Sequence, residues 1–332
     1  MQRAQLDPGC SARIVGRRGL YYDEGASPLL DRPAHVRAAS STAWLGARLA
    51  IVQDDANFIA LVDPQTGAAS SITLPAGADG KRLFDDLRGT KHAKLDLEAC
   101  FSVFDLGQWQ LVALGSGSEP PRERVVQLVF AADAAEVASM RVIDASAFYA
   151  QLHARHDFCG AELNLEGALV RGDTLLLVQR GNGATTSEDV PFNALGELSW
   201  PQFQAYLADP SGPVPTLTRV TPFELGERDG VRFTFTDATL TPAGNLLFVA
   251  SAEASSDSVT DGAVHGTRIG HIAEDGTTRM APLQNEDGTE SLLKAEGMVL
   301  DRTDARRAWI VVDMDDPALP ALLLEIALTF PA

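Results

Sequence analysis

The sequence predicts an all-β fold, namely a β-propeller of about five four-stranded blades. An acidic residue begins a short apolar run at Glu98, Glu166, Asp237 and Glu296, and Ser41 lies in a similar run that has no acid. After a turn, each run is followed by a second apolar run. The copies lie roughly 60 to 70 residues apart. Several short strands repeated at such an interval are typical of a propeller, in which each repeat forms one blade.

Turn signals rich in Gly, Asn and Asp divide each repeat into strands. The first unit is expected to have strands at 42–45, 49–52, 58–62 and 71–74. The second is expected to have strands at 98–104, 109–114, 124–130 and 140–143. The third is expected to have strands at 166–170, 174–179 and 216–223. The fourth is expected to have strands at 235–240, 246–251, 267–272 and 278–281. The fifth is expected to have strands at 296–300, 308–313 and 321–328.

The fifth unit is one strand short. A lone apolar segment at 12–16 is expected to supply the missing outer strand, which would close the ring and protect an open sheet edge. A sixth blade is the alternative, formed either in the coil at 20–39 or within the long third unit. The whole chain, residues 1–332, is expected to form one propeller domain.

Two helices are expected at 146–155 and 200–207, from apolar residues at helical spacing and from Ser199 as an N-cap. We name the strands of a blade A to D from the central channel outward. The starts of the A strands, the B–C turns and the D–A connections then lie on one face of the ring. The first helix is expected in a D–A connection and the second in a B–C turn, so that both would partly cover this face.

Composition limits the classes of partner. The 332 residues contain 45 acidic and 27 basic side chains, for a net charge of −18. Such a surface repels phosphate backbones, so nucleic acid binding is not expected. Three cysteines without metal-ligand spacing, Cys10, Cys100 and Cys159, fit a reducing compartment. The sequence shows neither a signal-peptide pattern nor an apolar stretch long enough to span a membrane, so a cytoplasmic protein that does not bind membranes is expected.

The four acids at the starts of A strands are expected to surround the mouth of the channel. Glu98, Glu166, Asp237 and Glu296 are therefore the candidate ligands of a divalent cation such as Ca²⁺, which prefers oxygen ligands. The alternative is a ring of salt bridges in which nearby bases neutralise these acids. The candidate ligand-binding residues on the same face are Lys94, Arg180, Asn182, Lys294 and Asp313.

The motifs around these acids resemble known propellers. The segments 96–98, 164–168, 235–238 and 294–297 are similar to those of uncharacterised bacterial propellers. They also resemble the esterase-like phytase domain and, more distantly, the gluconolactonase and senescence-marker group. The last resemblance implies that Glu98, Glu166, Asp237 and Glu296 hold a divalent cation that polarises a lactone or ester carbonyl. The first unit departs from that pattern, because Ser41 and Thr42 stand where the group has a glutamate.

Two functions follow as hypotheses. The first is a metal-dependent hydrolase of an ester, a lactone or a phosphoester, in which the cation acts as a Lewis acid. The second is a propeller without catalytic activity that binds a small molecule or a protein on the same face. The sequence contains no unambiguous general base, which keeps the second hypothesis open.

Overall fold

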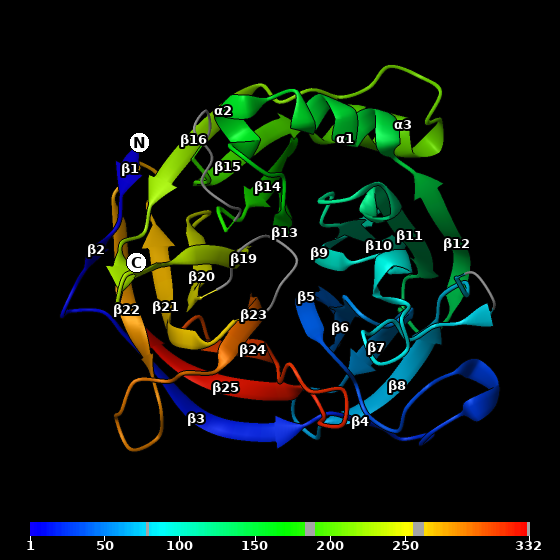
Figure 1. The fold of residues 1–332 in the computed structure, drawn as a ribbon, viewed down its shortest axis with the longest axis horizontal. Helices are drawn as coiled ribbons and strands as arrows, with labels where there is room; N and C mark the ends of the chain where they lie inside the picture. The colour runs from blue at the N-terminus through cyan, green and yellow to red at the C-terminus, as the bar shows by residue number, and fades with distance from the viewer. Residues whose placement is uncertain (78–79, 183–189, 255–261, 331–332) are drawn as a thin grey trace.

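The protein is an all-β propeller, as predicted. The structure is a computed structural model that describes residues 1–77, 80–182, 190–254 and 262–330. Its main strands form five antiparallel four-stranded blades around a central axis (Figure 1). Short strands from the N-terminal segment add to the outer edges of several blades.

The blades follow one another along the chain, and each begins with its inner strand. Blade 1 contains β5 (Ala39–Leu45), β6 (Arg48–Gln53), β7 (Phe58–Val62) and β8 (Ala68–Thr73). Blade 2 contains β9 (Leu97–Asp105), β10 (Gln108–Gly115), β11 (Arg124–Ala131) and β12 (Val137–Asp144). Blade 3 contains β13 (Leu165–Arg171), β14 (Thr174–Gln179), β15 (Asn193–Ser199) and β16 (Arg219–Glu224). Blade 4 contains β19 (Thr234–Leu240), β20 (Leu246–Glu253), β21 (Val264–Ile272) and β22 (Thr278–Gln284). Blade 5 contains β23 (Lys294–Leu300), β24 (Arg307–Asp313), β25 (Leu322–Thr329) and β3 (Ser11–Gly19).

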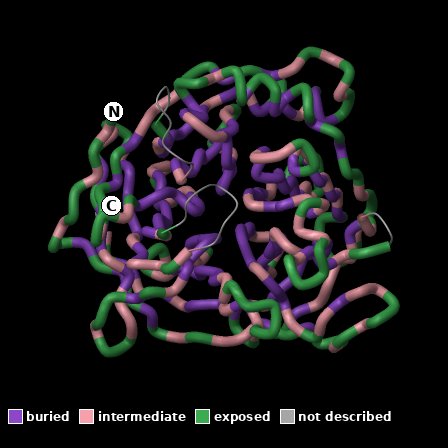
Figure 2. Tube along the Cα trace, in the orientation of Figure 1, coloured by how far each residue is buried: buried purple, intermediate pink, exposed green. Residues whose placement is uncertain are grey.

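The blades stack through apolar side chains on both sides of each sheet. Strand β14, for example, buries five consecutive residues after Thr174, because a neighbouring blade covers each face of its sheet. The inner strands β5, β9, β13, β19 and β23 lie nearest the axis (Figure 1), and the tube is mostly buried there (Figure 2). The free edges of the inner strands therefore face the central channel, where the predicted site residues lie.

The N-terminal residues 2–22, which we call the N-terminal belt, run along the outer edges of four blades. Strands β1 (Gln2–Arg3) and β2 (Gln5–Leu6) pair in parallel with β16 and β22. Strand β3 then pairs antiparallel with β25, and β4 (Tyr21–Tyr22) pairs in parallel with β8. The expected outer strand of the last blade is thus present. Within the described residues, the coil at 20–39 adds only β4 and the 3-10 turn η1 (Pro28–Leu30), not a sixth blade.

The two predicted helices exist, but their expected role as covers of the looped face is wrong. Helix α1 (Ser146–His153) and the single turn α2 (His156–Cys159) lie between blades 2 and 3. Strand β15, which the sequence analysis did not expect, places α3 (Trp200–Ala208) after the third strand of blade 3 and not in its B–C turn. Both longer helices lie on the outer rim (Figure 1).

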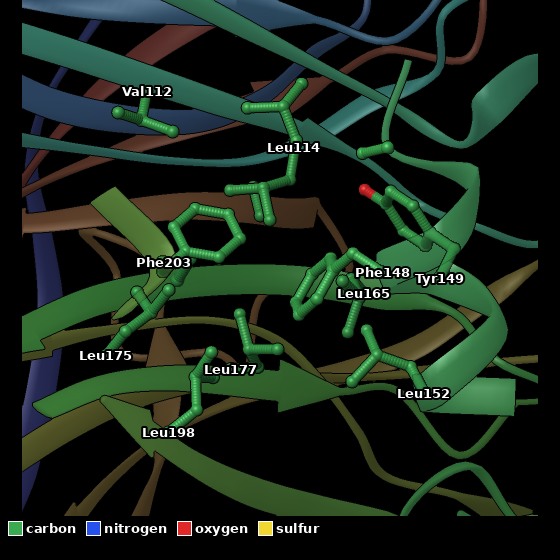
Figure 3. Packing of buried hydrophobic residues seen from close by; sticks show 14 of the residues in the cluster. Val112, Leu114, Phe148, Tyr149, Leu152, Leu165, Leu175, Leu177, Leu198 and Phe203 are labelled. Carbon is green, nitrogen blue, oxygen red and sulfur yellow. The ribbon is translucent and has the colours of Figure 1, made fainter. Parts of the chain in front are cut away.

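These helices close the gap between two blades. The rings of Phe148 in α1 and Phe203 in α3 are 5.0 Å apart. They pack on Leu114 of β10 and Leu177 of β14 (Figure 3). No helix among the described residues is long and apolar enough to span a membrane. The remaining short elements are β17 (Glu227–Arg228), β18 (Val231–Arg232), η3 (Lys91–Ala93) and η4 (Pro120–Arg122).

Candidate functional site

A polar cavity of about 240 Å³ lies on the looped face of the ring. The starts of inner strands contribute Ser40, Asp96, Glu98, Glu166, Lys294 and Glu296. The B–C turns and the strand ends beside them contribute Asp54, Arg122, Arg180, Asn182, Glu253 and Asp313. All five blades therefore contribute to the lining, and no residue of the three α-helices does.

A β-bulge near the start of each inner strand determines which side chain is turned toward the cavity. The pairing of each inner strand with the next shifts at one position, and the residues left out of the register are Ser40, Glu98, Glu166, Thr236 and Glu296, the last together with Gly297. A bulge adds one residue to a strand and changes the direction of its side chain. Three of the bulged residues are glutamates, and all three line the cavity.

Asp237 does not belong to this group, which corrects its expected placement beside the three glutamates. The bulged residue of β19 is Thr236, and Asp237 is the next residue. A shift of one residue along a strand turns the side chain to the other face. Asp237 is buried, and its Oδ2 accepts hydrogen bonds from the Met298 amide at 3.0 Å and from Ser41 Oγ at 3.3 Å. It connects blade 4 to blades 5 and 1, and it does not line the cavity.

Lys94 joins two acids on the side of the cavity formed by blades 1 and 2. Its Nζ lies 2.6 Å from Asp54 Oδ2 and 2.5 Å from Asp96 Oδ1. Arg122 Nη1 lies 3.1 Å from the other oxygen of Asp96. Burial raises the pKa of Asp96, but the charges of Lys94 and Arg122 outweigh burial and hold this pKa below its usual value. Asp96 is therefore ionised at neutral pH.

Arg180 holds two acids on the opposite side. Its Nη1 lies 3.0 Å from Glu166 Oε1, and its Nη2 forms a close ion pair with Glu253. Asn164 Nδ2 donates a second hydrogen bond to Glu166 Oε1, at 2.9 Å. Burial nevertheless raises the pKa of Glu166, although Arg180 opposes the shift. Glu166 is thus a firmly oriented carboxylate whose pKa is raised above that of a glutamate in water.

Lys294 is shared among four carboxylates. Its Nζ lies 2.9 Å from Asp315 Oδ1, 3.7 Å from both Glu253 Oε1 and Glu296 Oε1, and 3.9 Å from Asp313 Oδ2. Glu296 is only 4% exposed, and its second oxygen, Oε2, is buried without a hydrogen-bond partner. Burial raises the pKa of Glu296 well above its usual value, despite the nearby charge of Lys294.

Glu98 is the cavity acid with the least compensation. Among the described residues it takes part in no ion pair within 4.0 Å and in no hydrogen bond of its side chain. Burial raises its pKa well above the usual value, and repulsion from Glu166, Asp54 and Asp96 adds to the shift. One oxygen each of Asp54, Asp96 and Glu98 lies within 4.8 Å of the others. These three acids could together hold a cation.

The structure brings together eight of the nine predicted site residues. Glu98, Glu166 and Glu296 line the cavity, and so do the five predicted ligand-binding residues, Lys94, Arg180, Asn182, Lys294 and Asp313. Whether any of these residues binds a metal or a ligand stays a prediction.

The sequence analysis did not select Asp54, Asp96 or Glu253 as site residues. Asp96 had a usable signal, because it lies two residues before Glu98, and alternate residues of a strand share a face. Asp54 and Glu253 lie beside B–C turns, where acids are common for other reasons. Only the three-dimensional structure shows that they point toward the channel.

The greater part of the chain matches the model of one protein family. A model described as "Family of unknown function (DUF6929)" matches residues 35–328. The chain belongs to this family. The matched residues of this DUF6929 protein include every residue that lines the cavity, whereas strand β3 of the N-terminal belt precedes the match. No curated protein matches the sequence.

Several solved structures are similar to this DUF6929 protein in fold. A luciferin-regenerating enzyme is 8% identical with a TM-score of 0.45, over 88% of this chain and 92% of that one. The calcium-binding protein regucalcin from Agrobacterium tumefaciens is 12% identical with a TM-score of 0.40, over 95% of each chain. A gluconolactonase from Xanthomonas campestris is 11% identical with a TM-score of 0.36, over 91% of this chain and 88% of that one. The expected resemblance to the esterase-like phytase domain stays a prediction.

Proposed function

We propose that this protein is a hydrolase that depends on a divalent cation and acts on a small ester, lactone or phosphoester in the cavity. The observation that carries the proposal is the group formed by Asp54, Asp96 and Glu98, in which Glu98 forms no ion pair among the described residues. A group of carboxylate oxygens is the donor set that Ca²⁺ and other hard cations prefer.

The residues present fit such a cation. Asp54 Oδ1 is buried without a hydrogen-bond partner, and Glu98 has no ion pair among the described residues. Both offer oxygen atoms that protein donors do not use. A divalent cation bound to Asp54, Asp96 and Glu98 would supply Lewis acidity toward a carbonyl or phosphoryl oxygen. Lys94 and Arg122 keep Asp96 ionised, so that one ligand carries its charge at neutral pH.

Glu166 is the carboxylate best suited to accept a proton from an attacking water. A general base works best when its pKa lies near the working pH, and burial raises the pKa of Glu166 in that direction. Arg180 and Asn164 both bind its Oε1, which fixes the orientation of the carboxylate. The ester and lactone classes follow from the resemblance of the sequence motifs to gluconolactonase-type propellers.

The test measures cation binding and hydrolysis separately. The full chain, freed of metal with a chelator, is titrated with Ca²⁺ and with Mn²⁺ by calorimetry. It is then assayed against a panel of lactones, aryl esters and phosphate esters with and without each cation. We expect binding in the wild type and a loss of about tenfold or more in affinity in Glu98→Gln. Glu274→Gln removes an exposed acid from the turn between β21 and β22 and serves as the control.

A second function, ligand binding without catalysis, is favoured by a different observation. All six bases of the lining already pair with carboxylates, so the protein itself balances half of the twelve acidic side chains of the lining. The described lining also contains no histidine. Cation binding without hydrolysis of any substrate in the panel would favour this second function. Absence of both cation binding and hydrolysis would contradict the proposed hydrolase.

A further inference from the structure

The cavity carries a strong excess of negative charge. Its lining contains twelve carboxylate side chains and six basic ones, which leaves six formal negative charges. A divalent cation would still leave four. A concave site with one sign of charge attracts ligands of the opposite sign and repels those of the same sign. This balance disfavours phosphoesters and other anions with or without the cation.

The bases of the lining are not available to an anion. Arg37 Nη1 lies 3.2 Å from Asp85, and Lys91 Nζ lies 3.7 Å from Asp86. Lys94, Arg122, Arg180 and Lys294 form the ion pairs described above. An anionic ligand would have to break these buried pairs, and the carboxylates left behind would lose their partners. The acids that remain without compensation favour a cationic ligand, because burial raises the pKa of Glu98, Glu296 and Asp313 well above their usual values and a positive charge beside them would favour their ionised forms.

Four buried carboxylate oxygens of this lining lack a hydrogen-bond donor, namely Asp54 Oδ1, Asp55 Oδ1, Asp96 Oδ1 and Glu296 Oε2. Glu296 Oε2 has no hydrogen-bond partner, and the Glu296 side chain is nine-tenths or more buried while it lines the cavity. Buried polar atoms of native proteins nearly always have a partner, so an orphan acceptor requires an explanation. This acceptor is separate from the group of Asp54, Asp96 and Glu98.

We propose that the ligand of this cavity carries a protonated primary amine, and that Glu296 Oε2 accepts a hydrogen bond from this ammonium group. The inference deepens the proposed function and rests on it for the reaction, since it makes the substrate an amine-bearing ester or lactone. An ammonium group supplies three N–H donors and one positive charge, which match an orphan acceptor in an acidic cavity.

The size and the remaining lining agree with a small aliphatic amine. The volume of about 240 Å³ lies below the roughly 300 to 1,000 Å³ of pockets for drug-sized ligands. Phe84, Leu87 and Pro317 provide apolar surface in the same lining. A short carbon chain therefore finds apolar side chains as well as acids in the same lining.

The test uses three probes that share a carbon chain of the same length: putrescine, butanediol and succinate. Each is titrated into the metal-free full chain by calorimetry. We expect putrescine to bind, butanediol to bind about tenfold or more weakly, and succinate not to bind. Glu296→Gln should weaken putrescine binding about tenfold or more, while its affinity for Ca²⁺ stays unchanged. Glu274→Gln should behave as the wild type.

Two results would overturn the inference. One is equal affinity of the wild type for butanediol and putrescine, which would indicate a merely polar cavity. The other is unchanged putrescine binding in folded Glu296→Gln, which would place the amine elsewhere, for instance on Glu98. If Glu296→Gln does not fold, the comparison of the three probes on the wild type decides.

The two proposals can fail independently of each other. Putrescine binding through Glu296 without hydrolysis of any ester would refute the proposed reaction alone. Cation-dependent hydrolysis of neutral lactones, without competition by putrescine, would refute the amine preference alone.

Discussion

Gly167 of blade 3 lies directly against Asp237 of blade 4. A Cβ atom on Gly167 would come within 2.8 Å of Asp237 Oδ1 and within 3.0 Å of Val178 Cγ2. The position after the bulged Glu166 therefore requires a glycine, because a larger side chain would collide with the neighbouring Asp237 carboxylate. The Asp237 carboxylate is held in its place, because its oxygens accept hydrogen bonds from the backbone amides of Ala238 and Met298.

Gly167→Ala is expected to destabilise the protein by about 1–3 kcal/mol, because the added methyl group overpacks a buried contact. Urea denaturation measures the change. Gly16→Ala is the matched control, since its Cβ would only reach ordinary contact with Glu325 Cβ at 3.4 Å. Equal stability of Gly167→Ala and Gly16→Ala would contradict the close approach.

Removal of Arg180 takes the closest basic partner from two buried acids. Arg180→Met is expected to cost about 3–5 kcal/mol of stability, because Glu166 and Glu253 would remain buried and would lose the guanidinium that pairs with both of them. Arg219→Met is the control, because Arg219 is 65% exposed and its pair with Glu197 is an ordinary surface contact. We expect that control to cost about 0–1 kcal/mol. Similar losses in both variants would argue against a structural ion pair at Arg180.

Blade 5 depends on the buried side chains of β3. Ala12 and Ile14 are fully buried, whereas Val15 is 49% exposed. Ile14→Ala is expected to cost about 2–5 kcal/mol, through lost burial and the cavity it leaves. Val15→Ala should change stability by less than about 0.5 kcal/mol. Thermal and urea denaturation of the two variants measure these changes. If Ile14→Ala were as stable as the wild type, the role of β3 in closing the ring would be refuted.

Without a cation, the cavity makes stability depend on pH. The pKa of Glu98 in the folded protein lies well above its value of about 4.3 in the unfolded chain. The folded state then binds more protons than the unfolded state between these two pKa values. The contribution of Glu98 to stability is full below about pH 4 and is lost as the pH rises toward the native pKa.

We expect Glu98→Gln to flatten this dependence. In the presence of a chelator, the wild type should lose more stability than the variant when the pH rises from about 5 to about 8. The difference between the two proteins, not either curve alone, isolates Glu98 from the other acids. Parallel curves would show that its proton is not linked to folding.

Ca²⁺ should restore the stability that the metal-free protein loses as the pH rises. A cation that binds only the folded state adds about 2.7 kcal/mol at 100 times its dissociation constant. We expect Ca²⁺ to raise the melting temperature of the wild type and a chelator to lower it. Glu98→Gln should respond to neither, and Glu274→Gln should respond to both. A melting temperature that does not change with Ca²⁺ would indicate that the acids of the cavity are balanced by the protein's own bases, such as Lys94, Arg180 and Lys294, and not by a bound metal ion.

The propeller and its closing strand were predictable because they depend on apolar periodicity, which is local in sequence. Strand β15 was not, because Gly196 interrupts its apolar pattern and a glycine inside a strand weakens the signal. The error at Asp237 has a different cause. Acid-plus-apolar motifs align by sequence, but the bulge in β19 falls on Thr236. A one-residue difference in the bulge moves an acid out of the cavity, and no single sequence displays it.

The convergence of the B–C turns on the starts of the inner strands was predictable from the alternation of strand direction. The pairing within that face was not. Lys94 lies four residues before Glu98 in the sequence, but its Nζ binds Asp54 and Asp96. Long side chains choose among several acids at similar distances, and burial and geometry decide the outcome.

The N-terminal belt imposes an order on the synthesis and folding of this protein. During synthesis the chain emerges from its N-terminus, so β3 is made before the other strands of its blade, and its partner β25 is made after all the other blades. Ala12 pairs with Leu328, almost the full length of the chain away. The nascent β3 segment thus has no partner in its own blade until β25 has been made. The ring can close only at that point, and until then the edge of β3 that pairs with β25 stays open.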